Sequence, residues 1–90
     1  MWSKNKSRPT AQARKHAERL ASMPCGVCGA PGPSEVHEIR QGQFFTSIPL
    51  CADCHRGSHN GIHGQKRIWN VRKLDELAVL NSVIESLETA

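Results

Sequence analysis

The sequence CADCHRGSHNGIHG, residues 51–64, decides how this chain folds. It contains Cys51 and Cys54 as a C-x-x-C pair, and a second pair, Cys25 and Cys28, lies upstream. Each pair forms a tight turn that presents two thiolates to one ion, and the residues between the pairs bring the two turns together. Because four thiolates complete a tetrahedral shell, this spacing predicts a structural Zn²⁺ held by all four cysteines.

Histidines remain once that zinc site is filled. His55, His59 and His63 follow the second cysteine pair, and His37 lies between the two pairs. Joining the pairs through zinc brings the segment around His37 beside residues 55–63. A cluster of imidazoles with an open coordination position is what a hydrolytic metal centre requires. The sequence therefore predicts a second metal site from these four histidines, with His59 the weakest candidate because Gly57 interrupts a helix there.

The chain has 90 residues, of which 38% are hydrophobic, so we expect one small domain that needs a metal to stabilise it. Its net charge is +4, and most of the excess lies in the first twenty residues, where Glu18 is the sole acidic side chain. A basic arm on a nearly neutral body is typical of binding to a polyanion such as nucleic acid, and the alternative is a solubilising tail.

No stretch resembles a secretory signal or a membrane span, so we expect a cytoplasmic protein without a membrane partner. A reducing compartment favours metal-bound thiolates over the two alternatives, paired disulfides or free buried thiols.

The chain divides into a disordered basic arm and one domain, by charge and by turn residues. The expected segments are the arm at 1–9, the domain at 10–90, a basic helix at 10–23, a metal-binding core at 24–70 and an amphipathic helix at 73–88. The basic helix is expected because Thr10 can serve as its N-cap and helix-forming residues follow. Inside the core we expect strands over 34–40 and 44–50 and a single helical turn over 52–56.

The C-terminal helix has a clear apolar period. Leu77, Leu80, Ile84 and Leu87 recur at helical spacing with Val83 beside them, which predicts that this face covers the core together with Ile68 and Trp69. Glu76 is expected to face solvent, and Glu35 is expected on the strand surface. A dimer seam along this helix is the alternative, so the chain is expected to be a monomer or a homodimer.

Three motifs together resemble a known family. They are Cys25-Gly-Val-Cys28, Glu35-Val-His37-Glu38-Ile39 and Pro49-Leu-Cys-Ala-Asp-Cys54-His55. In this order they resemble the HNH (ββα-metal) endonuclease superfamily in its four-cysteine, zinc-stabilised form. The continuation through Gly61-Ile-His63-Gly64 is most similar to phage-borne recombination-enhancement nucleases, which cut DNA at recombinase filaments. The resemblance covers about residues 25–80.

The resemblance implies an α+β fold, a small ββα-metal domain with flanking helices. It implies a phage or prophage DNA endonuclease or nickase that uses one catalytic divalent ion, Mg²⁺ or Mn²⁺, with Zn²⁺ as the other candidate. The implied partners are DNA and a recombinase filament or another recruiting protein.

The resemblance also assigns roles, and the sequence departs from the family at one of them. His37 occupies the metal-ligand position, and Glu38 occupies the position where the family has a histidine that activates water. An ordinary glutamate, with a pKa of about 4.3, accepts a proton less readily at neutral pH than an imidazole with a pKa of about 6.5. Two assignments stay open: Glu38 is the base, or His37 is the base and Glu38 joins His55 and His63 on the metal.

The asparagine that steadies the base histidine in the family has no counterpart in the second strand, where only Thr46 and Ser47 are polar. The predicted phosphate contacts are basic side chains close to the motifs, and their alternative role is a solvated surface. They are Arg40, Lys66, Arg67, Arg14 and Lys15.

Two other functions stay open. The first is a non-catalytic, zinc-stabilised nucleic-acid-binding or adaptor module derived from an HNH nuclease, with Glu38 and the missing asparagine as traces of lost catalysis. The second is a zinc knuckle that binds only protein. The sequence does not indicate which DNA sequence or structure is recognised.

Overall fold

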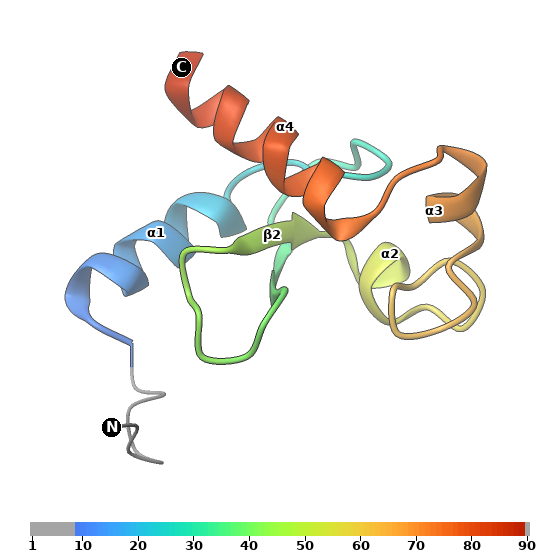
Figure 1. Cartoon of the computed structure of the whole chain (residues 1–90), viewed down its shortest axis with the longest axis horizontal. Helices are drawn as coiled ribbons and strands as arrows, with labels where there is room; N and C mark the ends of the chain where they lie inside the picture. The colour runs from blue at the N-terminus through green and yellow to red at the C-terminus, as the bar shows by residue number, and fades with distance from the viewer. Residues whose placement is uncertain (1–8, 90) are drawn as a thin grey trace.

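The computed structural model describes residues 9–89, so residues 1–8 of the predicted arm and Ala90 lie outside the described part. The chain forms α1 (Ala11–Ala21), β1 (Glu35–Glu38), β2 (Ser47–Leu50), α2 (Ala52–Arg56), α3 (Arg67–Val71) and α4 (Glu76–Thr89). Figure 1 shows α1 on one side of the hairpin, α2 and α3 on the other, and α4 passing over β2. The predicted α+β class is confirmed.

The two strands form one antiparallel hairpin. His37 pairs with Ile48, and Glu38 pairs with Ser47 at the end next to the turn. Both strands are shorter than predicted, because the residues expected to extend β2 belong to the turn. There the Ser47 hydroxyl donates a hydrogen bond to the Phe44 carbonyl (2.7 Å), and Gly42 adopts a φ of +90°. The turn therefore begins directly after His37 and Glu38, the two residues to which the family resemblance assigns roles.

Three of the described helices, α1, α2 and α4, begin where a side chain caps them. The Thr10 hydroxyl accepts from the Ala13 N–H (3.1 Å) at the start of α1, as the sequence predicts. The Cys51 sulfur accepts from the Cys54 N–H (3.4 Å) at the start of α2, and the Asp75 carboxylate accepts from the Ala78 N–H (2.8 Å) at the start of α4. The second cysteine pair therefore shapes a helix as well as offering thiols.

The core lies between β2, α1 and α4. All four residues of β2 are buried, and the buried apolar side chains around them form one cluster with the cysteine pairs. Its largest members are Trp69, Leu20, Ile48, Leu50 and Val79. Burial of Trp69, at 1% exposure, confirms the prediction that it belongs to the core.

The predicted buried face of α4 is wrong in part. Leu80 and Val83 are buried as predicted, but Leu77 and Ile84 are 71% and 48% exposed, and Val79 is buried instead. A close backbone approach accounts for this rotation of the helix: a Cβ added to Gly26 would lie 2.6 Å from the Val79 Cγ1. Packing against the first cysteine turn therefore selects the face of α4 that is buried. Within residues 9–89, none of the helices is both long and apolar enough to cross a membrane.

Candidate metal centres

The four cysteines form the first centre. Their sulfur atoms all lie within 4.8 Å of one another, and the sulfurs of Cys28 and Cys51 are 3.7 Å apart. A tetrahedral zinc with Zn–S bonds of about 2.3 Å separates its sulfurs by about 3.8 Å. The donor set and its spacing therefore fit zinc, and these residues could hold the ion.

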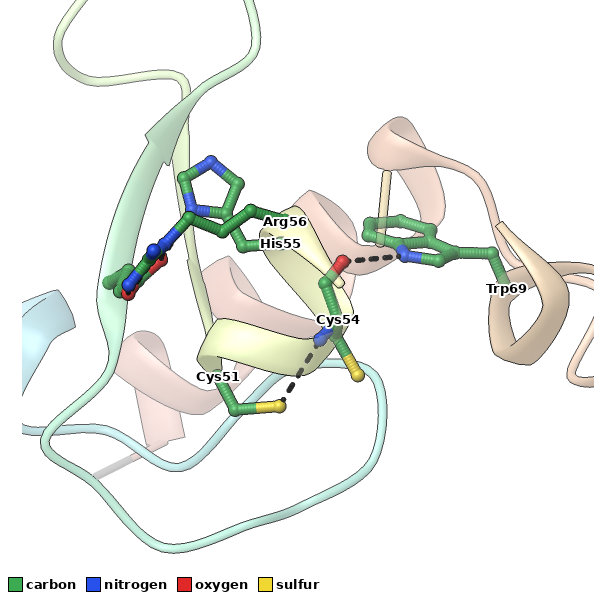
Figure 2. A network of polar contacts seen from close by, with 6 residues as sticks. Cys51, Cys54, His55, Arg56 and Trp69 are labelled. Carbon is green, nitrogen blue, oxygen red and sulfur yellow. Dashed lines mark hydrogen bonds and ion pairs between the residues drawn. The ribbon is translucent and has the colours of Figure 1, made fainter. Parts of the chain in front are cut away.

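Two different local structures place these thiols. In the first pair, the Gly29 N–H returns to the Cys25 carbonyl (2.9 Å), and Gly29 has a φ of +78°, which closes the turn. In the second pair, Cys51 caps α2 and Cys54 lies in its first turn, as Figure 2 shows. Each pair therefore points both sulfurs to one side of a rigid turn.

When no cation is bound, burial and the neighbouring sulfurs make it unfavourable for all four thiols to ionise together. Burial, followed by the neighbouring thiols, raises the pKa of Cys54, and burial also raises the pKa of Cys28. Burial acts against ionisation of Cys25 as well, but backbone N–H groups outweigh it and lower the pKa of Cys25 to about 7. Cys25 therefore ionises more readily than Cys28 or Cys54, and a bound cation would stabilise the thiolates of these two.

Trp69 connects this centre to the core. Its indole N–H donates to the Cys54 carbonyl (3.0 Å), and both residues are almost completely buried. Figure 2 shows Trp69 and Cys54 on one side of α2, with His55 and Arg56 extending the other way toward β1. The short helix therefore separates the cysteine cluster from the residues that carry the second centre.

Three histidines form that second centre. One nitrogen from each of His37, His55 and His63 lies within 4.8 Å of the other two, and the ring centroids are 5.0–5.1 Å apart. The three rings line an open cavity of about 390 Å³ together with Glu38. Imidazole nitrogens at this spacing suit a divalent ion that also keeps positions for water or phosphate oxygen. We call these three residues the histidine trio.

The trio is assembled from three segments. His37 lies on β1 and is 8% exposed, His55 lies on α2, and His63 lies in the loop before α3 and is exposed. The His63 N–H donates to the His55 carbonyl (3.2 Å), which holds the loop against α2. The loop is too tight for a side chain at Gly64, since a Cβ there would lie 2.4 Å from the Gly57 carbonyl oxygen. The glycines after His55 therefore bring His63 back to it.

Two carboxylates form hydrogen bonds with rings of the trio, and neither was predicted to contact it. The Glu76 Oε2 lies 2.5 Å from the His37 Nε2, and the Glu35 Oε1 lies 2.7 Å from the His55 Nδ1. The expectations that Glu76 faces solvent and that Glu35 is only strand surface are wrong. Strand alternation and helix period place these side chains on a face, but they do not reveal which distant ring that face meets.

Glu35 also makes an ion pair with Arg56. The Arg56 guanidinium donates from Nε and Nη2 to both carboxylate oxygens. These hydrogen bonds, followed by the one from His55, lower the pKa of Glu35 to about 2. Glu35 therefore stays an anion that accepts from His55 throughout the neutral range.

The other predicted site residues are not members of the trio. His59 is exposed, and its ring is not part of the group of nitrogens within 4.8 Å. Glu38 lines the cavity, but its Oε1 accepts from the Gly42 N–H (2.9 Å) and so closes the hairpin turn. The five predicted phosphate contacts, Arg14, Lys15, Arg40, Lys66 and Arg67, are all exposed, on α1, at the hairpin turn and at the start of α3.

Comparison of this chain with protein-family models, with curated proteins and with solved structures found no match.

Proposed function

We propose that this chain is a metal-dependent DNA endonuclease or nickase of the HNH (ββα-metal) type, with one structural zinc and one catalytic divalent ion. The observation that supports this most directly is the histidine trio. It is formed by a hairpin strand, a short helix and the loop after it, it lines an open cavity, and it lies across that short helix from the four-cysteine cluster. A domain that only needed zinc for stability would have no use for three converging imidazoles.

His37 is the residue best suited to be the general base. It is nearly buried, its ring faces the other two imidazoles, and the carboxylate of Glu76 accepts from it. A carboxylate behind an imidazole orients the ring and stabilises the cation that forms when the ring takes a proton. Glu38 is less suited, because its carboxylate already accepts from the Gly42 N–H. This favours the assignment in which His37 activates water.

His55 and His63 would then hold the catalytic ion, with Glu38 close enough to the cavity to contribute an oxygen. A divalent ion there would supply a Lewis acid that stabilises charge on the phosphate and on the leaving oxygen. His37 takes a proton from a water molecule whose oxygen bonds to phosphorus as the bond to the 3′ oxygen breaks. The products are a 5′-phosphate and a 3′-hydroxyl, whose proton comes from solvent.

The surface charge supports DNA as the substrate. The chain carries a net charge of +4, and the predicted phosphate contacts are exposed. Contacts of this kind position a DNA backbone without reading its sequence. The domain has few elements that could enter a groove, so we expect low intrinsic sequence specificity and recruitment by a partner such as a recombinase filament.

A supercoiled-plasmid assay tests the proposal. The wild type is incubated with Mg²⁺ or Mn²⁺, with and without EDTA, beside His37→Ala and the matched control His16→Ala, at equal zinc content. We expect the wild type and His16→Ala to nick in a metal-dependent way and His37→Ala to be about 10²–10⁴-fold slower. Equal nicking by His37→Ala, or none by the wild type on double-stranded, single-stranded and recombinase-coated DNA, contradicts the proposal.

One observation favours a second candidate, a zinc-stabilised DNA-binding adaptor. Glu38, in the position of the family's base, serves the hairpin turn, and the second strand offers no asparagine beside His37. For an adaptor, replacing all three histidines of the trio leaves DNA affinity and its salt dependence unchanged while no variant cuts. Binding measured by fluorescence anisotropy at several salt concentrations separates it from the nuclease.

A further inference from the structure

Two rings of the histidine trio are hydrogen-bonded to carboxylates that come from elements far apart in the sequence. Glu35 is the first residue of β1, and Glu76 is the first residue of α4, 39 residues after His37. Each carboxylate contacts one ring, and each contacts a different ring nitrogen. This difference has a chemical consequence, because the nitrogen that donates to a carboxylate cannot also accept a proton or bind a metal.

At His37 the bonded atom is Nε2. A carboxylate only accepts hydrogen bonds, so Nε2 must carry the hydrogen when the ring is neutral, and the lone pair is then on Nδ1. The side chain of His37 is 9% exposed, which leaves the ring little freedom to turn over. Glu76 is itself partly shielded, with 33% of its side chain exposed.

At His55 the bonded atom is Nδ1. Glu35 accepts from it at 2.7 Å while it also holds the Arg56 guanidinium through two oxygens. The neutral His55 ring therefore carries its hydrogen on Nδ1, and its lone pair is on Nε2. The two rings, 5.1 Å apart by centroid, thus offer opposite nitrogens.

We propose that Glu76 and Glu35 are positioning residues that fix opposite tautomers in the histidine trio, so that His37 offers Nδ1 as the proton acceptor and His55 offers Nε2 to the catalytic ion. Glu76 thereby supplies from α4 the support for the base that the second strand lacks. The two roles rest on the proposed nuclease function, but the two tautomers do not.

The tautomers can be measured without DNA. In the zinc-loaded, ¹⁵N-labelled protein at pH 8, two-bond ¹H–¹⁵N correlation spectra identify which ring nitrogen carries the hydrogen. We expect the hydrogen on Nε2 for His37 and on Nδ1 for His55. Glu76→Ala should alter only the His37 pattern and Glu35→Ala only the His55 pattern. Glu85→Ala, which removes an exposed carboxylate from the same helix as Glu76, should alter neither.

Removing each of the two carboxylates should also affect a different function of the site. Glu35→Ala should weaken Mn²⁺ binding at the second centre by about 10–100-fold, because a ligand loses the group that orients it. Glu76→Ala should leave Mn²⁺ binding nearly unchanged and slow nicking by about 10²–10⁴-fold, because the base loses its orientation. Titration calorimetry on zinc-loaded protein measures the first effect, and plasmid nicking at saturating Mn²⁺ measures the second.

Glu76→Gln keeps the proposal testable if Glu76→Ala does not fold. Its amide oxygen can still accept from Nε2, so it should retain the His37 tautomer and more of the nicking rate than Glu76→Ala. Finding the hydrogen on Nδ1 of His37, or a His37 pattern that does not respond to Glu76→Ala, overturns the inference whatever the protein does to DNA. The expected tautomers in a protein that never cuts would instead uphold the inference and contradict the proposed function.

Discussion

The cysteine cluster and the histidine trio lie on opposite sides of one short helix, and they differ in almost every physical respect. Cys25 and Cys54 are almost completely buried, and the cluster is joined to the core through Trp69. The trio lines an open cavity, has one exposed member, and is bonded to carboxylates rather than packed in apolar side chains.

The proposed roles follow this difference, with structure proposed for the cysteine cluster and chemistry for the trio. Four thiolates close a coordination shell, whereas the proposed imidazole ligands, His55 and His63, would leave positions for water and phosphate. Cys54 and His55 are adjacent in sequence, yet the helix directs one to each centre (Figure 2). A mutation on one side of α2 should therefore affect folding, and one on the other side should affect metal chemistry.

The largest effect should follow the loss of a zinc ligand. Cys54→Ser should lose the zinc and unfold, because structural zinc contributes an apparent binding free energy of about 10–16 kcal/mol, comparable to the whole stability of a small domain. Zinc content by mass spectrometry and thermal unfolding by circular dichroism measure this. A metal-free variant that melts cooperatively close to the wild-type temperature would show that the cysteine cluster does not hold the fold.

The next largest effect should come from the residue that joins the cluster to the core. Trp69→Ala should reduce the free energy of unfolding by about 3–5 kcal/mol, because it leaves a cavity and removes a donor from the Cys54 carbonyl. Urea unfolding of zinc-loaded protein measures it. Val71→Ala, on the same helix but 78% exposed, should change stability by no more than about 0.5 kcal/mol, and an equal loss in both variants would contradict a special role for Trp69.

Mutations in the trio should affect metal binding rather than stability. His63→Ala should change the free energy of unfolding by no more than about 0.5 kcal/mol, since the side chain is exposed, and should weaken Mn²⁺ binding by more than about tenfold. Calorimetric titration of zinc-loaded protein with Mn²⁺ gives the affinity, and urea unfolding gives the stability. If His63→Ala binds Mn²⁺ as tightly as the wild type, His63 is not a ligand.

The smallest effect should come from the histidine that lies outside the trio. His59→Ala should alter Mn²⁺ affinity by no more than about twofold, because its exposed ring contributes no nitrogen to the cluster. The same titration measures it, and His63→Ala serves as the comparison. A loss as large as that of His63→Ala would make His59 a ligand and enlarge the trio.

Local sequence patterns were sufficient to predict several elements. The Thr10 cap and the helix formers after it predicted α1, and the second cysteine pair predicted the turn of helix over residues 52–56. The spacing of the cysteines predicted a four-thiol cluster that the structure contains. These features depend on contacts between residues close in sequence, or on one ion that requires four donors, so spacing alone describes them.

The sequence by itself thus determined the α+β class, the cysteine cluster and the set of histidines from which the trio is drawn. Tertiary structure decided which side chains form hydrogen bonds with that trio and which face of α4 is buried. Glu76 meets His37 from the start of α4, and the same helix buries Val79 against Gly26 while Leu77, on the face its apolar period favoured, stays exposed. Such a contact depends on the rotation and register of elements far apart in the chain, which no local period encodes.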